Sequence, residues 1–398
     1  MTSRMRQFIV AFITLFALER QALGQNAVCL TDELMYRADP DLHTHLEQLA
    51  QLAQEHQYQK GGGDPVVPVV VHVVWNTAAE NIADAVIQGF VAQMDEDFNL
   101  LNANAGTVRP AFTPVMADVG IRFCLAQYDP QGVPTSGITR TYTTDTWFDP
   151  NSEPHDMKGA PDGISAWDPT RYLNIWVCDI VGSSGNIVSG YTYLPTGGMA
   201  GSWQDGLVID YSYGVDPGER TPTHEAGHYF GLRHTFDGNS CSLDDGFSDT
   251  PNTNSPTWNC NNTNLMKCSQ LTQYENYMDY SGCTAMFTTQ QANFMNGVLN
   301  GVRASLLSSS GCAGWSTVAD ERTAARSKVY PVPATDALYV QLPAIAKFQL
   351  LDASGRIALE GLLRPAAPVD IRALGAGPYW LRITGDDWSE VHRVLVER

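Results

Sequence analysis

The spacing of hydrophobic residues predicts a sheet with helices packed on it, followed by a separate β module. The continuous apolar run at 66–75, VVPVVVHVVW, is typical of a buried strand. Apolar positions in 83–100 recur at the three- and four-residue spacing of a helix. Further strands are predicted at 121–128, 172–178, 190–195 and 206–213. The order strand, helix, strand, strand favours an α/β (α+β) domain.

The pattern changes toward both ends of the chain. Ahead of the first strand, one helix face is predicted, and a flexible linker at 60–63 (KGGG) follows it as the predicted cleavage site. After Cys312, a small and polar linker spans 313–327. Short alternating strands then predict a β-sandwich at 328–398, with a hairpin turn at Ser354-Gly355. The expected helix face comprises Leu42, Leu46, Leu49 and Leu52.

Composition and the N-terminus indicate an exported protein. Residues 1–24 have Arg4 and Arg6 ahead of an apolar run of 11 residues and a small-x-small ending, which is typical of a signal peptide. No other transmembrane candidate follows, so the mature chain is expected to have none. The net charge of −19 argues against a nucleic-acid partner. Export allows the eight cysteines to form disulfides.

The stretch HEAGHYFGLRH, which begins at His224, has the spacing of a metal-binding helix. His224 and His228 are one helical turn apart, so both imidazoles face one ion. Gly231 allows the sharp turn that ends the helix and brings His234 round as a third ligand. Three neutral nitrogens leave a fourth position for water, as in catalytic zinc sites. Glu225 is then placed to take a proton from that water and pass it to a leaving amine.

The alternative is a helix that carries surface histidines and binds no metal. That interpretation leaves the positions of Glu225 and Gly231 without a reason, so the metal site is favoured. A single histidine elsewhere gives no such indication. His72, inside the first predicted strand, is expected to be a packed core residue.

Several motifs carry a resemblance to a known family. HEAGHYFGLRH resembles the zinc signature of the metzincin metalloproteases, and ENYMDYSGC at 275–283 resembles their Met-containing turn. Together with YLNIWVC, DGLVIDY and DTPN, in this order, these motifs resemble the pappalysin family over residues 66–312. The resemblance implies a zincin-like domain with a mixed sheet and an active-site helix. It also implies that Glu225 is the general base and acid, and that zinc is bound by His224, His228 and His234.

The same resemblance assigns roles around the turn. Met278 is expected to form an apolar floor under the metal. Tyr280 is expected near the metal, where a phenol can stabilise the tetrahedral intermediate; the alternative is a core aromatic residue. The resemblance further selects one of the three possible pairings of four cysteines, namely Cys241–Cys268 and Cys260–Cys283.

The loop CSLDDGFSDTPN, at 241–252, is a candidate calcium site. Closely spaced carboxylates and carbonyls suit a hard cation, and pappalysin-like enzymes carry structural calcium here. The alternative is a solvated acidic loop. The candidate ligands are Asp245, Asp249 and Thr250.

Cys29 is a candidate for keeping the enzyme latent. The segment CLTDELMYRADPD resembles the start of pappalysin-like propeptides, and a Cys29 thiolate can occupy the fourth zinc position. The alternative is that Cys29 pairs with another cysteine. If it does not, seven cysteines remain, so one of Cys124, Cys178 and Cys312 must stay free.

The last 71 residues resemble the sorting domain of type IX secretion, with VYPVPATDALYV, LLDASGRI and RVLVER as the similar stretches. The resemblance implies transit across a bacterial outer membrane, followed by release or surface attachment. A binding β-module is the alternative. The expected division is signal peptide 1–24, propeptide 25–63, catalytic domain 64–312, linker 313–327 and sorting domain 328–398.

The function predicted from these observations is a secreted zinc endopeptidase, made as a latent zymogen, that cuts proteins or peptides. An extended substrate is expected to pair with an edge strand, for which GYTYLP at 190–195 is the candidate. The first alternative is a catalytically silent, surface-attached binding protein with a metal-stabilised domain. Glu225 argues against it, because a silent domain has no need of a general base. A second alternative is a zinc hydrolase of non-peptide amides.

Overall fold

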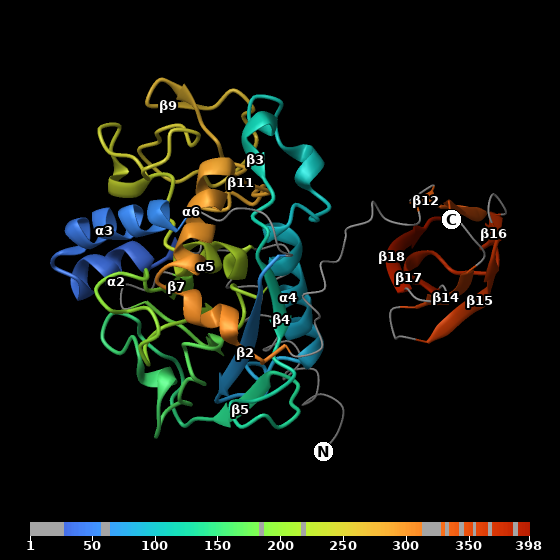
Figure 1. Ribbon diagram of the computed structural model, residues 1–398, viewed down its shortest axis with the longest axis horizontal. Coiled ribbons are helices and arrows are strands. Elements are labelled where there is room, and N and C mark those ends of the chain that lie inside the picture. Colours follow the sequence, from blue (N-terminus) through green and yellow to red (C-terminus); the bar gives the residue numbers. More distant parts are fainter. Residues whose placement is uncertain are drawn as a thin grey trace, which may run out of the picture. The chain divides into compact units, whose positions relative to one another are not determined.

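The computed structural model of the chain describes residues 28–56, 64–182, 187–215, 220–312, 328–330, 334–341, 346–352, 356–364, 368–384 and 389–398. It contains two compact units, residues 1–317 and 318–398 (Figure 1). The expected signal peptide, the linkers at 60–63 and 313–327, and the turn at 354–355 lie outside the described residues. Within the described ranges, no helix has the length and apolarity that a membrane crossing requires.

A seven-stranded mixed sheet forms the centre of the first unit, which confirms the predicted fold class. Its order is β1-β7-β8-β6-β2-β4, and β5 also pairs with β2. All pairs in this sheet are parallel except β7 with β8. β1 and β5 were not predicted, because each is a short strand without a continuous apolar run. The strands are β1 (Val28–Cys29), β2 (Val66–Trp75), β4 (Arg122–Leu125), β5 (Ile138–Tyr142), β6 (Leu173–Cys178), β7 (Val188–Thr192) and β8 (Leu207–Asp210).

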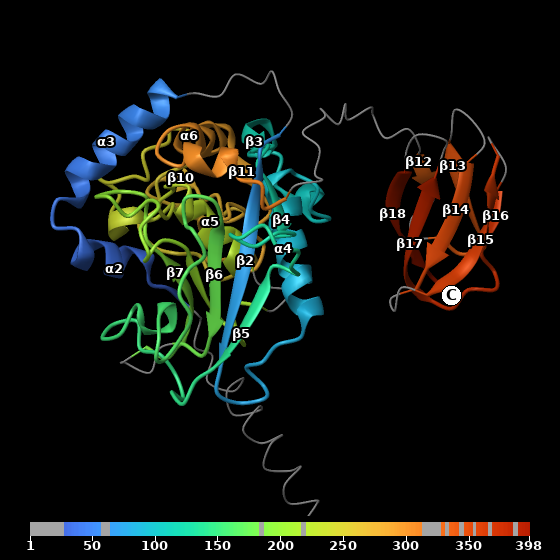
Figure 2. The same ribbon diagram turned by 60° about the horizontal axis from the view of Figure 1, so that its bottom comes forward.

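Helices cover both faces of this sheet (Figure 2). Side chains at alternate positions of β2 pack with α4 and α5 on one face. On the opposite face, Trp176 of β6 and Tyr191 of β7 pack with Leu34 and Met35 of α2. The motif HEAGHYFGLRH therefore begins on a helix that is held directly against the sheet. The helices are α2 (Thr31–Ala38), α3 (Leu42–Glu55), α4 (Asp84–Phe98), α5 (Thr221–Tyr229) and α6 (Thr289–Asn300).

Short elements complete the first unit. Two small antiparallel pairs join β3 (Met116–Ala117) to β11 (Phe287–Thr288) and β9 (Met266–Lys267) to β10 (Gln270–Leu271). Brief 3-10 helices occur at Ala105–Thr107, Thr113–Val115, Asp156–Lys158, Asp237–Asn239 and Ala304–Ser308.

The buried face of α3 differs by one residue from the predicted one. Leu42, Leu49 and Ala53 are buried, whereas Leu52 is 38% exposed. On the buried face of α3, Leu49 is followed one helical turn later by Ala53, at the i, i+4 position. A leucine three residues after Leu49 therefore lies at the edge of that face.

His72 is fully buried in β2, as predicted for a core histidine. Its Nδ1 lies 2.7 Å from the Thr139 hydroxyl, and its Nε2 lies 3.0 Å from the Asn174 side-chain oxygen. Burial, opposed by the bond to Asn174, lowers the pKa of His72 to about 4. The ring is therefore a neutral, hydrogen-bonded part of the core.

The second unit is a β-sandwich of two antiparallel sheets, as predicted. The sheets have the orders β12-β13-β16 and β15-β14-β17-β18. They enclose one apolar core that includes Leu338, Leu350, Ile371 and Leu381. The strands are β12 (Lys328–Tyr330), β13 (Ala337–Gln341), β14 (Ala346–Leu351), β15 (Ile357–Leu363), β16 (Pro368–Asp370), β17 (Gly377–Thr384) and β18 (Ser389–Val396).

Candidate metal centre and active site

The fold brings the three histidines of the motif to one point. All residues of α5 are buried, and His224 and His228 project from the same face of this helix. Gly231 has φ +89°, a left-handed conformation that reverses the chain just after the helix. His234 then returns to the other two histidines. The Nε2 atoms lie 3.1 Å (His224–His228), 3.1 Å (His224–His234) and 3.2 Å (His228–His234) apart.

The other nitrogen of each ring is held by an acceptor. His224 Nδ1 lies 2.6 Å from the Tyr277 carbonyl, and His228 Nδ1 lies 2.7 Å from the Leu232 carbonyl. His234 Nδ1 lies 2.7 Å from a carboxylate oxygen of Asp32. These acceptors place a hydrogen on each Nδ1 and leave a lone pair on each Nε2.

Three lone pairs that converge at about 3 Å repel one another unless a cation lies among them. Zinc is bound by imidazole nitrogens in this arrangement, so the residues fit this metal. Burial lowers the pKa of His224 to about 3 and that of His228 well below its usual range, which keeps both neutral. Burial also lowers the pKa of His234, but the Asp32 carboxylate outweighs it and raises the pKa overall.

Glu225 is fully buried beside the histidines. Its Oε2 accepts a hydrogen bond from the Thr31 hydroxyl at 3.3 Å, while its Oε1 has no partner among the described residues. Burial raises the pKa of this carboxyl to about 8, against hydrogen bonds from Cys29 and Thr31 that lower it. A carboxyl with a pKa near neutrality can both accept and return a proton at physiological pH.

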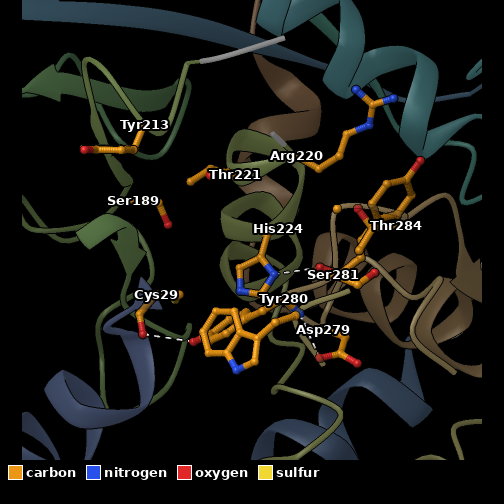
Figure 3. Close-up of a pocket in the computed structure, with 13 residues that line it drawn as sticks. Cys29, Ser189, Tyr213, Arg220, Thr221, His224, Asp279, Tyr280, Ser281 and Thr284 are labelled. Atoms are coloured by element: carbon orange, nitrogen blue, oxygen red, sulfur yellow. Dashed lines mark hydrogen bonds between the residues drawn. The ribbon is translucent and has the colours of Figure 1, made fainter. Parts of the chain in front are cut away.

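Cys29 and Tyr280 face the same point from two other elements (Figure 3). The Cys29 sulfur lies within 4.8 Å of a ring nitrogen of each of the three histidines. The Tyr280 hydroxyl donates to the Cys29 carbonyl at 3.1 Å and lies 3.2 Å from His234 Nε2. Burial raises the pKa of the Cys29 thiol well above its usual range. A nearby metal cation would favour the thiolate.

The Met-containing turn packs directly against α5. Met278 is fully buried, and its sulfur lies 2.5 Å from the position that a Cβ would occupy on Gly227. Any side chain at position 227 would collide with this sulfur. The turn also supplies the Tyr277 carbonyl that orients His224, so the two segments fix each other.

Asp97 of α4 links α5 to the Met-containing turn through hydrogen bonds. This role of Asp97 was not predicted from the sequence. Its carboxylate accepts from the Thr223 hydroxyl at 2.7 Å and from the Tyr277 hydroxyl at 2.8 Å. Arg220 lies 3.3 Å away. Burial raises the pKa of Asp97 to about 6, although Arg220 and both hydroxyls lower it. An acidic residue in an amphipathic helix usually faces water, so no local signal identifies it.

Thr31 and Asp32 were also missed, although they stand two and three residues after Cys29. Thr31 contacts Glu225, and Asp32 contacts His234, so one short segment touches the candidate base and a candidate ligand. Their position directly behind the cysteine in CLTD was the available signal.

β7 carries the segment proposed for pairing with substrate, and β1 covers its outer edge. The pairing is parallel, with Val28 opposite Val188 and Cys29 opposite Gly190. The backbone groups that would bind a substrate strand are therefore engaged by residues 28–29 in this structure.

A pocket of about 340 Å³ opens beside His224 (Figure 3). Hydroxyl groups dominate its wall, and Arg220 lies at one end. A pocket next to the histidine cluster suits a substrate side chain close to the bond that is cut. The hydroxyl-bearing residues are Ser189, Tyr213, Thr221, Tyr277, Tyr280, Ser281 and Thr284.

The three candidate calcium ligands in the loop 241–252 have different hydrogen-bond partners. Asp245 is buried, and its Oδ1 accepts from the Thr250 hydroxyl at 2.6 Å. Its Oδ2 has no partner among the described residues, and burial raises its pKa to about 7. The Asp249 carboxylate instead accepts from the Thr288 hydroxyl and from the backbone N–H of Gln290 at the start of α6.

Three disulfides hold the first unit together: Cys124–Cys312, Cys241–Cys268 and Cys260–Cys283. Cys29 and Cys178 are free and buried. The last two disulfides brace the loop between the zinc motif and the Met-turn, which has little regular secondary structure.

Comparisons with known proteins agree with this geometry. Residues 163–300 match the family described as pregnancy-associated plasma protein-A. Residues 328–397 match the secretion system C-terminal sorting domain. An extracellular metalloprotease of Colletotrichum graminicola is 29% identical over 279 residues, 66% of this chain and 88% of that protein. One from Podospora anserina is 36% identical over 139 residues, 31% of this chain and 45% of that protein.

Two solved structures are similar over most of their own length. A Tannerella forsythia promirolysin mutant is 32% identical with a TM-score of 0.62, covering 70% of this chain and 96% of that one. Tannerella forsythia mature mirolysin with a cleaved peptide is 34% identical with a TM-score of 0.57, covering 62% and 97%. The predicted family, extracellular location and enzyme class are thereby confirmed. The chain belongs to the pappalysin family of metalloproteases and is a secreted metalloendopeptidase with a C-terminal sorting domain.

Proposed function

We propose that this chain is a zinc endopeptidase made in a latent form, in which His224, His228 and His234 bind the metal. The observation that carries the proposal is the convergence of three buried Nε2 atoms whose opposite nitrogens are already hydrogen-bonded. When bound, zinc supplies a Lewis acid that polarises a carbonyl and lowers the pKa of water. The carboxylate of Glu225 accepts the proton of the attacking water and returns it to the leaving amine.

Other residues support this chemistry. The Tyr280 hydroxyl, 3.2 Å from His234 Nε2, is proposed to donate a hydrogen bond to the developing oxyanion. Met278 and Gly227 keep the helix seated on the Met-turn. The edge of β7 that β1 covers is proposed to pair with the substrate backbone after the segment at 28–29 leaves.

Latency is proposed to come from the segment at 25–63. Cys29 would contribute a thiolate as the fourth metal ligand, which excludes the water that attacks the substrate. Thr31 occupies an oxygen of the candidate base at the same time. Cleavage between residues 55 and 64 would then be required before the proposed catalytic domain at 64–312 becomes active.

Replacing Cys29 with alanine is expected to raise the activity of the zinc-supplied precursor on casein by about ten- to hundredfold. The reason is that, without its thiolate ligand, the segment at 28–31 would leave the β7 edge and Glu225 more often, so that water and substrate reach the site. Cys178→Ala is the matched control, since Cys178 is the other free buried thiol. The proposal of a cysteine-based block fails if both variants remain as silent as the wild type while the mature enzyme digests casein. If the mature enzyme is also silent, the binding-protein alternative is favoured.

We also propose a calcium ion at the loop 241–252. The support is the buried Asp245 Oδ2, which has no partner among the described residues. Thr250 and Asp249 are the further candidate ligands. Calcium is expected to raise the unfolding temperature of the wild type, but not that of Asp245→Asn. Equal responses of the two proteins in a thermal scan would contradict this site.

The family and the sorting domain indicate the partners. A peptidase of this family acts on proteins or peptides, and the C-terminal domain indicates export by type IX machinery to the outside or to the outer-membrane surface. We propose that the sorting domain is residues 328–398, joined by the linker at 313–327.

A further inference from the structure

The pro-segment contacts the enzyme at a second place, away from the histidines. Helix α3 packs against α6 (Figure 2), and Leu49 and Ala53 of α3 pack with Phe294, Val298 and Val302 of the enzyme. The two helices thus form an apolar contact that contains none of the candidate catalytic residues.

This contact depends on glycine. A Cβ at Gly297 of α6 would lie 2.1 Å from the carbonyl oxygen of Ala53 and 2.8 Å from its Cα. The three nearest atoms to that position all belong to Ala53. The helices therefore touch backbone to backbone, and any side chain at position 297 would force them apart.

Glycine is an unfavourable residue in the interior of a helix. It destabilises a helix by about 1 kcal/mol relative to alanine. Gly297 stands within a helix of the catalytic unit, and its closest contacts come from the pro-segment alone. The residue is therefore accounted for by the docking of α3.

The docking face extends along α6 in helical steps. Leu49 lies 3.0 Å from the Cβ position of Gly231, at the end of the zinc motif, and His56 lies 3.5 Å from that of Gly301. Phe294 and Gly297 of α6, together with Gly301 directly after the helix, have the i, i+3 and i+7 spacing of neighbouring positions on one side of it. We define these three residues with Val298 as the α6 docking face.

We propose that the α6 docking face is a binding site for the amphipathic helix α3, and that it retains the pro-segment after the chain is cut. The inference rests on the proposed function. A cut between residues 56 and 64 breaks one peptide bond but leaves every contact of Leu49 and Ala53 intact. Activation therefore takes two events, cleavage of the linker and displacement or destruction of α3.

The test uses the full chain and lysyl endopeptidase, because Lys60 is the single lysine ahead of Lys158. After cleavage, size-exclusion chromatography with mass spectrometry shows whether the pro-segment elutes with the enzyme, and casein digestion reports activity. We expect the cut wild type to retain the fragment and stay silent. Gly297→Ala should lose the fragment and become at least about tenfold more active.

Two matched controls isolate the docking face. Gly89→Ala also adds a methyl group to a helical glycine, but a Cβ there meets nothing within 4 Å, so retention should be unchanged. Leu49→Glu should release the fragment without altering the mature enzyme, whereas Leu52→Glu, at a position that is 38% exposed, should not.

The inference is overturned if the cut wild type sheds the fragment at once, or if Gly297→Ala and Leu49→Glu hold it as firmly as their controls. Fragment release is measured independently of catalysis. A released fragment with a mature enzyme that digests no casein would instead contradict the proposed function.

Discussion

Glu225→Gln is expected to lower the proteolytic activity of the mature enzyme by about 10³- to 10⁴-fold. The amide keeps the shape of the carboxyl but cannot accept the proton of the attacking water. Glu225 is fully buried next to the histidine cluster, and its Oε1 has no partner among the described residues, so it is available for this task. The three histidines are unchanged, and zinc content should stay at the wild-type level. Casein digestion and metal analysis of the same preparation provide the measurement.

Tyr280→Phe provides a graded comparison for Glu225→Gln. Loss of one hydrogen-bond donor to the oxyanion is expected to lower activity by about 10²- to 10³-fold. A core role for the ring alone would leave activity nearly unchanged, because phenylalanine fills the same space. If Glu225→Gln retains more than a tenth of wild-type activity with full metal content, its assignment as the general base is wrong.

Arg303→Met is expected to lower the free energy of unfolding by about 3–5 kcal/mol. The Arg303 guanidinium is buried, and its two terminal nitrogens donate to the Asp205 carboxylate at 2.6 and 2.9 Å. Its Nε donates to the Tyr229 carbonyl at 2.8 Å, and its planar group lies 3.4 Å from the Tyr229 ring centre. Removal of the charge leaves Asp205 buried without its partner. Denaturant unfolding of the mature chain measures the loss.

Two comparisons test whether the buried ion pair is the cause. The double variant Arg303→Met with Asp205→Leu should be more stable than Arg303→Met alone, since no buried charge is then left unpaired. Arg140→Ala breaks an exposed ion pair with Asp84 and should cost less than about 1 kcal/mol. Equal losses for Arg303→Met and Arg140→Ala would show that burial has no part in the effect.

Replacement of Arg303 is also expected to affect the active site, because Arg303 contacts Tyr229, the last residue of α5. Tyr229 ends α5, and Arg303 follows α6, so the ion pair ties the C-terminal ends of both helices to the loop that carries Asp205. Looser packing at this point would move His228, one residue earlier. We therefore expect the destabilised variant to bind zinc more weakly as well.

The strands and helices that could be predicted from sequence are those with strong periodicity. β2 has the predicted bounds, and α4 begins and ends within one or two residues of the predicted helix. Long apolar patterns of this kind predict an element well because they reflect the burial of one or both of its faces. β1 and β5 lack such a pattern. Their pairing depends on the edge that β7 and β2 offer, so they exist only in the context of the sheet.

The sequence by itself determined the metal motif, because the spacing from His224 to His234 fixes their geometry through one helix and one glycine turn. It also determined the family, through motifs that are local in the chain. Only the tertiary structure decided which distant groups position the residues of this motif: Asp97 on α4, the Tyr277 carbonyl, and Thr31 and Asp32 near the N-terminus. The contact between α3 and Gly297 was likewise decided only by the tertiary structure. Hydrogen bonds and backbone contacts between segments far apart in the chain leave no periodic trace, since each requires only one residue at the place where the fold brings it.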